Sequence, residues 1–345
     1  MSYQFRVGIT PDFYTDAKGR FEGPLEEKLS PVKGIEVSAM PPQPDRTVTA
    51  AAADEFDAIF ALGINFTRSS VEGVKRLALI ARWGVGYDMI DIPAITEADV
   101  LLAITPQAVR RPVAEAILTY ILMLSKNVIE QDRTVRKGKW RASLSRLGTC
   151  LPGRTLGSLG CGNIARELFR LAGGLGFGRM IAHDPFADAA AAAKLGVELV
   201  SIEELFRESD YLAVNCLLNE QTRGLVGAEQ LRMMKPSAFF INTARGPIVR
   251  QPDLVRALRE RWIAGAGIDV FEKEPPETAE PLLELDNVIL SPHALAWTGE
   301  IVRDNGIEAC ENILALARGE IPHGAVNREV LKRPGFQKKL ERYRQ

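Results

Sequence analysis

The chain has 345 residues, and a domain typically has roughly 150, so we expect two domains or one unusually large one. Apolar residues make up 46% of the sequence and charged residues 25%, which is typical of a globular protein and excludes a disordered or fibrous chain. The 43 basic and 44 acidic residues leave a net charge of -1. Without an overall basic field, neither nucleic acid nor an anionic membrane is an expected partner.

The first residues, MSYQFRVGITPDF, lack the basic flank and the apolar segment of a secretory signal. No run of about 18 or more apolar residues occurs in the sequence. The cysteines are few and far apart, without a CxxC pair or metal-finger spacing, so we expect reduced thiols and no metal site. These features predict a cytoplasmic protein.

Short apolar segments alternate with amphipathic ones along the whole chain, which predicts an α/β fold with doubly wound parallel sheets. The expected strands of a first series lie near residues 5–10, 35–40, 58–63, 77–81 and 100–105. Those of a second series lie near residues 155–160, 179–183, 211–216, 238–242, 266–270 and 288–290.

A long helix is expected between the two series, over residues 112–137, because Pro112 suits a first helical position. Such a helix could join two domains. Ser201 and Glu204 have the spacing of a capping box before SIEELFRES. The segment 298–318 has a helical pattern, and only a short basic tail is expected at the end of the chain.

The segment RTLGSLGCGNIAREL places Gly160-x-Gly162-x-x-Ala165 between an apolar strand and an amphipathic helix. In this context the first glycine permits a tight turn and the second lets backbone amides approach a pyrophosphate. Asn163 and Ile164 then open the helix whose N-terminus faces the anion. The alternative is a glycine-rich connection without a ligand.

Asp184 ends the next expected strand, 24 residues after Gly160. A carboxylate at this place accepts hydrogen bonds from the ribose hydroxyls of NAD and repels the 2'-phosphate of NADP. The sequence therefore predicts NAD as the cofactor. The alternative is that Asp184 only caps the turn before Pro185.

Three further segments carry polar residues near the ends of expected strands: INTARGPIV, GAGIDVFEKEPP and LSPHALAWTGE. Ligands bind at the carboxyl ends of parallel strands. Reduction of a ketone by hydride needs a proton donor, which His293 could be, and a carboxylate such as Glu274 favours the protonated imidazole. Arg245 offers a planar fork for the carboxylate of a 2-oxo acid. Taken singly, each residue could instead be structural or part of a surface ion pair.

The order and spacing of these segments, with ARWGVGYDMID and PVAEAILTYILML before them, resemble the D-isomer-specific 2-hydroxyacid dehydrogenase family over residues 77–327. The resemblance implies a flavodoxin-like substrate domain, 1–106 with 299–345, and an inserted NAD-binding Rossmann domain, 107–298. It implies a homodimer formed through the NAD domain, to which the segment 136–147 could contribute.

The resemblance also implies a set of site residues. Arg245, Glu274 and His293 would be catalytic, and the backbone amides of Val85 and Gly86 would bind the substrate carboxylate together with Arg245. The implied cofactor residues are Gly160, Gly162, Asn163, Ile164, Asp184, Thr243 and Asp269, the last near the nicotinamide carboxamide.

The implied function is NAD-dependent interconversion of a D-2-hydroxy acid and its 2-oxo acid. A non-catalytic NAD(H)-sensing scaffold on the same fold is the alternative. The family's usual His-x-Pro-Leu reads Asn215-Cys216-Leu217-Leu218, which removes a proline from the cofactor side. Arg110 and Arg111 could enter the substrate site or be solvated. Trp83 and Trp297 could line that site or fill the core.

Overall fold

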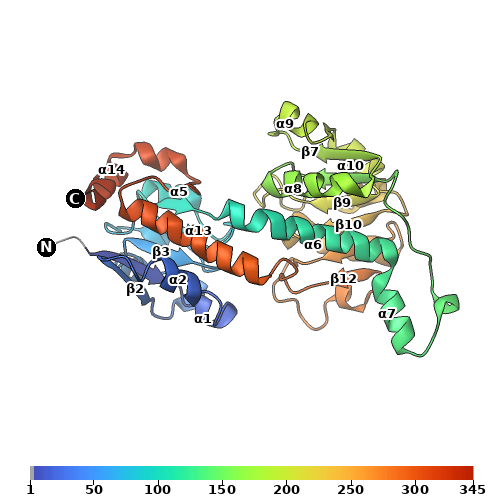
Figure 1. The fold of residues 1–345 in the computed structure, drawn as a ribbon, viewed down its shortest axis with the longest axis horizontal. Coiled ribbons are helices and arrows are strands. Elements are labelled where there is room, and N and C mark those ends of the chain that lie inside the picture. Colours follow the sequence, from blue (N-terminus) through green and yellow to red (C-terminus); the bar gives the residue numbers. More distant parts are fainter. Residues whose placement is uncertain (1–3, 345) are drawn as a thin grey trace. The chain divides into compact units, whose positions relative to one another are not determined.

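The computed structural model describes residues 4–344. The chain divides into two compact units, one formed by the residues up to Val109 with those from Trp297 onward, the other by Arg110–Ala296 (Figure 1). The expected domain boundaries were 106/107 and 298/299, near these divisions. The division into a substrate domain, 1–106 with 299–345, and an NAD-binding domain, 107–298, stays a prediction.

The first unit contains a parallel five-stranded sheet in the order β2-β1-β3-β4-β5, as observed over the described residues. This 2-1-3-4-5 order is that of flavodoxin-like folds. The strands are β1 (Phe5–Ile9), β2 (Ile35–Ala39), β3 (Ala58–Ala61), β4 (Leu79–Arg82) and β5 (Leu101–Ala103).

Helices cover both faces of this sheet, and successive residues of a strand serve opposite faces. In β3, Ala58 and Phe60 enter one apolar core, and Ile59 and Ala61 enter the other. The helices of this unit are α1 (Phe13–Asp16), α2 (Glu22–Lys28), α3 (Ala50–Ala53), α4 (Arg68–Val71), α5 (Ile92–Glu97), α13 (Gly299–Ala317) and α14 (Pro334–Tyr343).

The second unit contains a parallel seven-stranded sheet within the described residues, in the order β12-β11-β10-β9-β6-β7-β8. Counted from its own first strand, this is the 3-2-1-4-5-6 order of a Rossmann fold with one strand added. The strands are β6 (Thr155–Leu159), β7 (Arg179–His183), β8 (Val197–Leu199), β9 (Tyr211–Val214), β10 (Phe239–Asn242), β11 (Gly265–Ile268) and β12 (Val288–Leu290).

This sheet also separates two apolar cores. Phe240 belongs to one core, and its neighbours Phe239 and Ile241 belong to the other. The helices of the second unit are α7 (Val128–Arg136), α8 (Asn163–Ala172), α9 (Ala189–Ala193), α10 (Ile202–Glu208), α11 (Ala228–Met233) and α12 (Gln251–Arg259). The predicted α/β fold with two doubly wound sheets is confirmed.

The connecting helix begins earlier and ends earlier than expected. Helix α6 (Pro106–Lys126) has Pro106 at its start, and Pro112 lies inside it. The carboxylate of Glu308 accepts hydrogen bonds from the amides of Gln107, at 3.2 Å, and Ala108, at 2.9 Å. This cap from α13 starts the helix before Pro112, so the prediction of a start at Pro112 was wrong.

Helix α6 then ends at Asn127, which has a left-handed φ of 56° and separates it from α7. The single helix expected up to residue 137 is therefore two helices. No single helix of residues 4–344 is long and apolar enough to cross a membrane, and the bent pair α6 and α7 passes that test only by length and composition.

Ser201 caps α10 as expected, accepting a hydrogen bond from the amide of Glu204 at 3.1 Å. The carboxylate of Glu204 accepts a hydrogen bond from Arg179 at 3.2 Å. The cap is therefore confirmed for the serine, while the glutamate joins α10 to β7.

Candidate active site and family

In the glycine-rich turn between β6 and α8, one glycine is tightly surrounded by other atoms and the other faces open space. Gly160 has a φ of +102°, and a Cβ there would lie 2.7 Å from the backbone nitrogen of Cys216, so a side chain does not fit. At Gly162, the N-cap of α8, a Cβ would meet no atom within 4 Å. The open space lies at a helix N-terminus, begun by Asn163 and Ile164, and it suits a pyrophosphate.

Asp184 follows β7 and contacts this turn. Its Oδ2 accepts a hydrogen bond from the amide of Cys161 at 2.8 Å, and its Oδ1 accepts one from the amide of Phe186 at 2.9 Å. The carboxylate thus both caps the following turn and lies beside the glycine-rich turn. Its place suits the ribose of a dinucleotide.

The loop after β10 is shaped by the buried side chain of Asn242. Its Nδ2 donates to the carbonyl of Arg245 at 3.0 Å, and its Oδ1 accepts from the amide of Ala244 at 3.0 Å. Between them, the hydroxyl of Thr243 is buried and has no hydrogen-bond partner among the described residues. Because buried hydroxyls are normally paired, Thr243 has capacity for a ligand.

Gly246 places Arg245 next to the loop that follows β11. A Cβ on Gly246 would lie 1.9 Å from the carbonyl carbon and oxygen of Phe271, so the two backbones are in direct contact. The loop after β11 carries Glu274, whose carboxylate is stabilised by the charge of Arg245. The arginine and the glutamate are thereby brought into one site.

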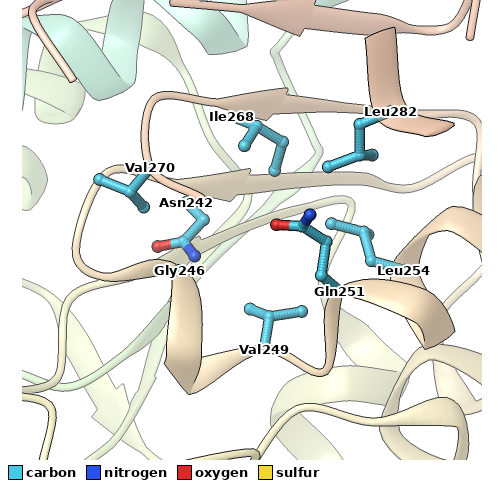
Figure 2. A pocket seen from close by; sticks show the side chains of 8 residues that line it. All are labelled: Asn242, Gly246, Val249, Gln251, Leu254, Ile268, Val270 and Leu282. Atoms are coloured by element: carbon cyan, nitrogen blue, oxygen red, sulfur yellow. The ribbon is translucent and has the colours of Figure 1, made fainter. Parts of the chain in front are cut away.

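A small cavity lies behind this contact, with a volume of about 10 Å³ (Figure 2). Its lining is mostly apolar and consists of Asn242, Gly246, Val249, Gln251, Leu254, Ile268, Val270 and Leu282. A space of this size holds one water molecule at most. The cavity is therefore a packing defect beneath the loop and not a substrate site.

His293 and Glu274 form a pair, with 2.8 Å between Nδ1 of the imidazole and Oε2 of the carboxylate. The other oxygen, Oε1, accepts a hydrogen bond from the amide of Phe271 at 3.0 Å. Burial raises the pKa of Glu274, but the hydrogen bond and charge of His293, the Phe271 amide and the charge of Arg245 together bring that pKa below its usual value. Glu274 is thus an anion at neutral pH and leaves Nε2 of the imidazole for another partner.

The turn that carries His293 is held by Asp269. His293 has a left-handed φ of 52°, and its amide donates to the carbonyl of Asp269 at 2.8 Å. The buried carboxylate of Asp269 accepts hydrogen bonds from the amides of Ala294, at 3.0 Å, and Leu295, at 3.2 Å. These bonds fix a backbone conformation that residues other than glycine seldom adopt.

Val85 and Gly86 belong to the first unit, in the turn after β4. Nε of Arg82 donates to the carbonyl of Gly86 at 2.8 Å, and the amide of Gly84 donates to the hydroxyl of Thr105 at 2.8 Å. The backbone is thus held on either side of Val85, and both Val85 and Gly86 are half-buried.

The sequence leaves the roles of four residues open. Arg110 and Arg111 are exposed and lie 4.0 Å and 3.5 Å from carboxylate oxygens of Glu167. Trp83 is 4% exposed, as a core residue is, and its ring meets that of Trp297 edge-on, with 6.0 Å between centroids. Trp297 remains 36% exposed.

The second unit thus brings together Arg245, Glu274, His293, Asp269 and Thr243, while the cofactor turn lies on other strands of the same sheet. Asn242 and Gly246, which have a part in this arrangement, were not singled out from the sequence. Only Gly246 had a signal, as the glycine directly after the candidate arginine.

The arrangement agrees with comparisons to known proteins. Residues 118–294 match the D-isomer specific 2-hydroxyacid dehydrogenase NAD binding domain. The chain is 38% identical to a glyoxylate reductase of Korarchaeum cryptofilum over 85% of this chain and 90% of that protein. It is 36% identical to a glyoxylate reductase of Aeropyrum pernix over 96% of this chain and 99% of that protein.

Among solved structures, a glyoxylate reductase from Paecilomyes thermophila superimposes with a TM-score of 0.80 at 27% identity, covering 95% of this chain and 100% of that one. These matches confirm the predicted family and NAD as the cofactor, and they support an enzyme and not a scaffold. The chain belongs to the D-isomer specific 2-hydroxyacid dehydrogenase family and is an NAD-dependent oxidoreductase that interconverts a D-2-hydroxy acid and its 2-oxo acid.

Proposed function

We propose that the substrate is glyoxylate or another small 2-oxo acid, and that His293 is the acid and base of the reaction. The observation that carries the proposal is the His293–Glu274 pair, at 2.8 Å, beside Arg245. The glyoxylate reductases that match most of the chain support the substrate.

In the reduction, a hydride and a proton add to the 2-oxo group of the substrate. When bound, NADH supplies the hydride for the carbonyl carbon. His293 gives the proton to the carbonyl oxygen through Nε2, since Nδ1 is held by Glu274. The anionic Glu274 stabilises the protonated imidazole before the transfer and orients its ring. In the oxidation, His293 takes the proton back from the hydroxyl.

The carboxylate of the substrate needs cationic and N–H partners. Arg245 supplies a fork with two parallel donors, and the amides of Val85 and Gly86 supply a backbone site in the first unit. With its carboxylate on the fork of Arg245, a 2-oxo acid would present its carbonyl, and not its carboxylate, to the imidazole. The cofactor is held by the glycine-rich turn, Asp184, Thr243 and Asp269.

The test is the rate of NADH oxidation with glyoxylate, hydroxypyruvate, pyruvate, phenylpyruvate and a phosphorylated 2-oxo acid. We expect kcat/KM to be highest for glyoxylate or hydroxypyruvate. His293→Ala should lower kcat by about 100-fold or more, because general acid catalysis typically accelerates a reaction by that factor. His323→Ala, which changes an exposed histidine, is the control. A His293→Ala enzyme as fast as its parent would remove His293 from the mechanism.

We also propose a homodimer formed through α7 and the loop after it, which project from their unit in Figure 1. The supporting observation is a set of large apolar side chains that are exposed on α7 and the loop after it, Val128, Val135, Trp140 and Leu147, with Leu122 near the end of α6. Leu147 is 85% exposed and Trp140 69% exposed. A second copy of the chain would remove this apolar surface from water.

Light scattering after gel filtration tests the dimer. The double variant Trp140→Ala/Leu147→Asp should elute as a monomer where the parent is a dimer. Ile321→Asp, which changes an exposed apolar residue of the first unit, should leave the dimer intact. A monomeric parent would contradict the proposal.

A cytoplasmic location is the last part of the proposal. It is supported by the cysteines Cys150, Cys161, Cys216 and Cys310, which are all unpaired in the structure, as is usual in a reducing compartment. Cell fractionation with an antibody against the chain tests it, and recovery with secreted proteins would contradict it.

A further inference from the structure

A buried tyrosine contacts the candidate active site from behind. Tyr120, in α6, is 1% exposed. Its ring lies on β11, where a Cβ at Gly267 would be 2.5 Å from the ring. A glycine at this place lets the helix lie directly on the strand that leads to Asp269.

The hydroxyl of Tyr120 begins a chain of hydrogen bonds. It contacts the hydroxyl of Ser291, which in turn donates to Oδ1 of Asp269. A serine hydroxyl has one hydrogen, which Ser291 donates to the carboxylate. The tyrosine must therefore be the donor in its hydrogen bond to the serine. Burial raises the pKa of Tyr120 well above its usual value, so the phenol keeps its proton.

The chain ends at the carboxylate oxygen that holds the histidine turn. Oδ1 of Asp269 also accepts from the amides of Ala294 and Leu295, directly after His293. No hydrogen bond from the rest of the described chain reaches Oδ2. The serine hydroxyl therefore fixes the rotation of the carboxylate, with one oxygen on the turn and the other left for a ligand.

We propose that Tyr120 is a positioning residue for the reaction: through Ser291 it fixes the carboxylate of Asp269 and with it the turn that presents His293. The inference rests on the proposed role of His293. Tyr120 itself touches no reacting atom and acts through two intervening side chains. Removal of its hydroxyl should loosen the turn and leave the binding of the 2-oxo acid nearly unchanged.

The test compares Tyr120→Phe with Tyr211→Phe. Tyr211 is a matched control because it is also buried in the second unit, and its hydroxyl is 3.0 Å from that of Thr149, away from Asp269. Three quantities are measured: kcat for the 2-oxo acid, its isotope effect with NADH deuterated at the transferred hydrogen, and hydrogen exchange of the amides of Ala294 and Leu295 without cofactor.

We expect Tyr120→Phe to lower kcat by about 3- to 10-fold, the factor that one net hydrogen bond is worth. The isotope effect should increase, because hydride transfer becomes slower, and the two amides should exchange faster. Tyr211→Phe should leave all three unchanged. Ser291→Ala should resemble Tyr120→Phe, the double variant should be no worse than Ser291→Ala, and Ser291→Thr should keep the parent rate.

Two results would overturn the inference: parent values in Tyr120→Phe, or equal changes in Tyr120→Phe and Tyr211→Phe, which would show general destabilisation. His293→Ala separates this failure from that of the proposed site. If His293→Ala is inactive and Tyr120→Phe matches its parent, only the role of Tyr120 is wrong. If His293→Ala is fully active, the proposed site itself is wrong.

Discussion

The backbone contact at Gly246 predicts a large effect from a single methyl group. In Gly246→Ala the new Cβ would lie 1.9 Å from the carbonyl of Phe271, where real contacts are at least 3.0 Å. Both partners are backbone, so no side chain can rotate away, and one loop must move by roughly 1 Å. A displacement of this size between catalytic groups costs about 100-fold in rate. We therefore expect kcat/KM for 2-oxo acid reduction to fall about 100-fold.

The assay is steady-state NADH oxidation, with NADH binding followed separately by fluorescence. Because the glycine-rich turn and Asp184 are carried by other strands, and only Thr243 and Asp269 of the proposed cofactor site lie near this contact, NADH affinity should change less than kcat. Gly173→Ala is the matched control, since it adds the same methyl group in the same unit where no atom lies within 4 Å. A folded Gly246→Ala enzyme with the parent kcat/KM would refute the idea that this contact joins Arg245 to Glu274.

Three further outcomes are expected. Glu274→Gln removes an anion whose pKa lies below its usual value, so the alkaline fall of kcat/KM for reduction should move to lower pH; an unchanged pH profile would contradict the pairing. Asp184→Asn should raise kcat/KM with NADPH relative to NADH by about 10-fold, because a repulsive charge is lost, and an unchanged ratio would exclude Asp184 from cofactor selection. Lys339→Met should destabilise the protein by about 1–3 kcal/mol, whereas Lys338→Met, at an exposed site, should not. Burial lowers the pKa of Lys339 to about 8 from 10.5; between these pH values the unfolded chain holds the proton that the folded chain has lost, so the stability of the parent relative to Lys339→Met should increase with pH. Thermal unfolding at pH 7 and pH 10 measures it, and a smaller difference at pH 10 would contradict the sign.

Most of the strands that were predicted contain several buried apolar residues; the exceptions are β2, which has no buried residue, and β12, which has one. The missed strand, β8, has three residues, and Glu198 in its middle is exposed. It lies at the edge of the sheet, where one partner suffices, so its sequence carries little of the usual signal.

Helix α14 was missed for a different reason. Its buried residues Phe336, Lys339, Leu340 and Tyr343 follow a helical period, but a lysine counts as exposed in any sequence pattern. Here Nζ of Lys339 donates to the carbonyls of Leu77, Ala98 and Asp99. These acceptors lie more than 200 positions away in sequence, so the basic segment was interpreted as a tail.

The residues of the candidate site likewise include some that could be predicted from the sequence and some that could not. Arg245, Glu274 and His293 could be chosen from the sequence because each follows an apolar strand and has a chemistry that the reaction needs. Tyr120 could not be chosen, since a tyrosine within an apolar helix is ordinarily a core residue. Its part in the site depends on Gly267, which lets the ring approach the sheet, and on Ser291, which receives its hydrogen bond.

The meeting of residues so far apart along the chain follows from the register of three neighbouring strands. Asn242, the last residue of β10, is aligned with Ile268, the last of β11, and Ile268 is aligned with Leu290, the last of β12. The loops that carry Arg245, Glu274 and His293 therefore leave the sheet at one level. Register alone brings these loops to the same edge, but only loop contacts can set distances of 2.8 Å between side chains. Substitutions that disturb the loop contacts, such as the one at Gly246, should thus reduce catalysis while the sheet and its cofactor turn remain intact.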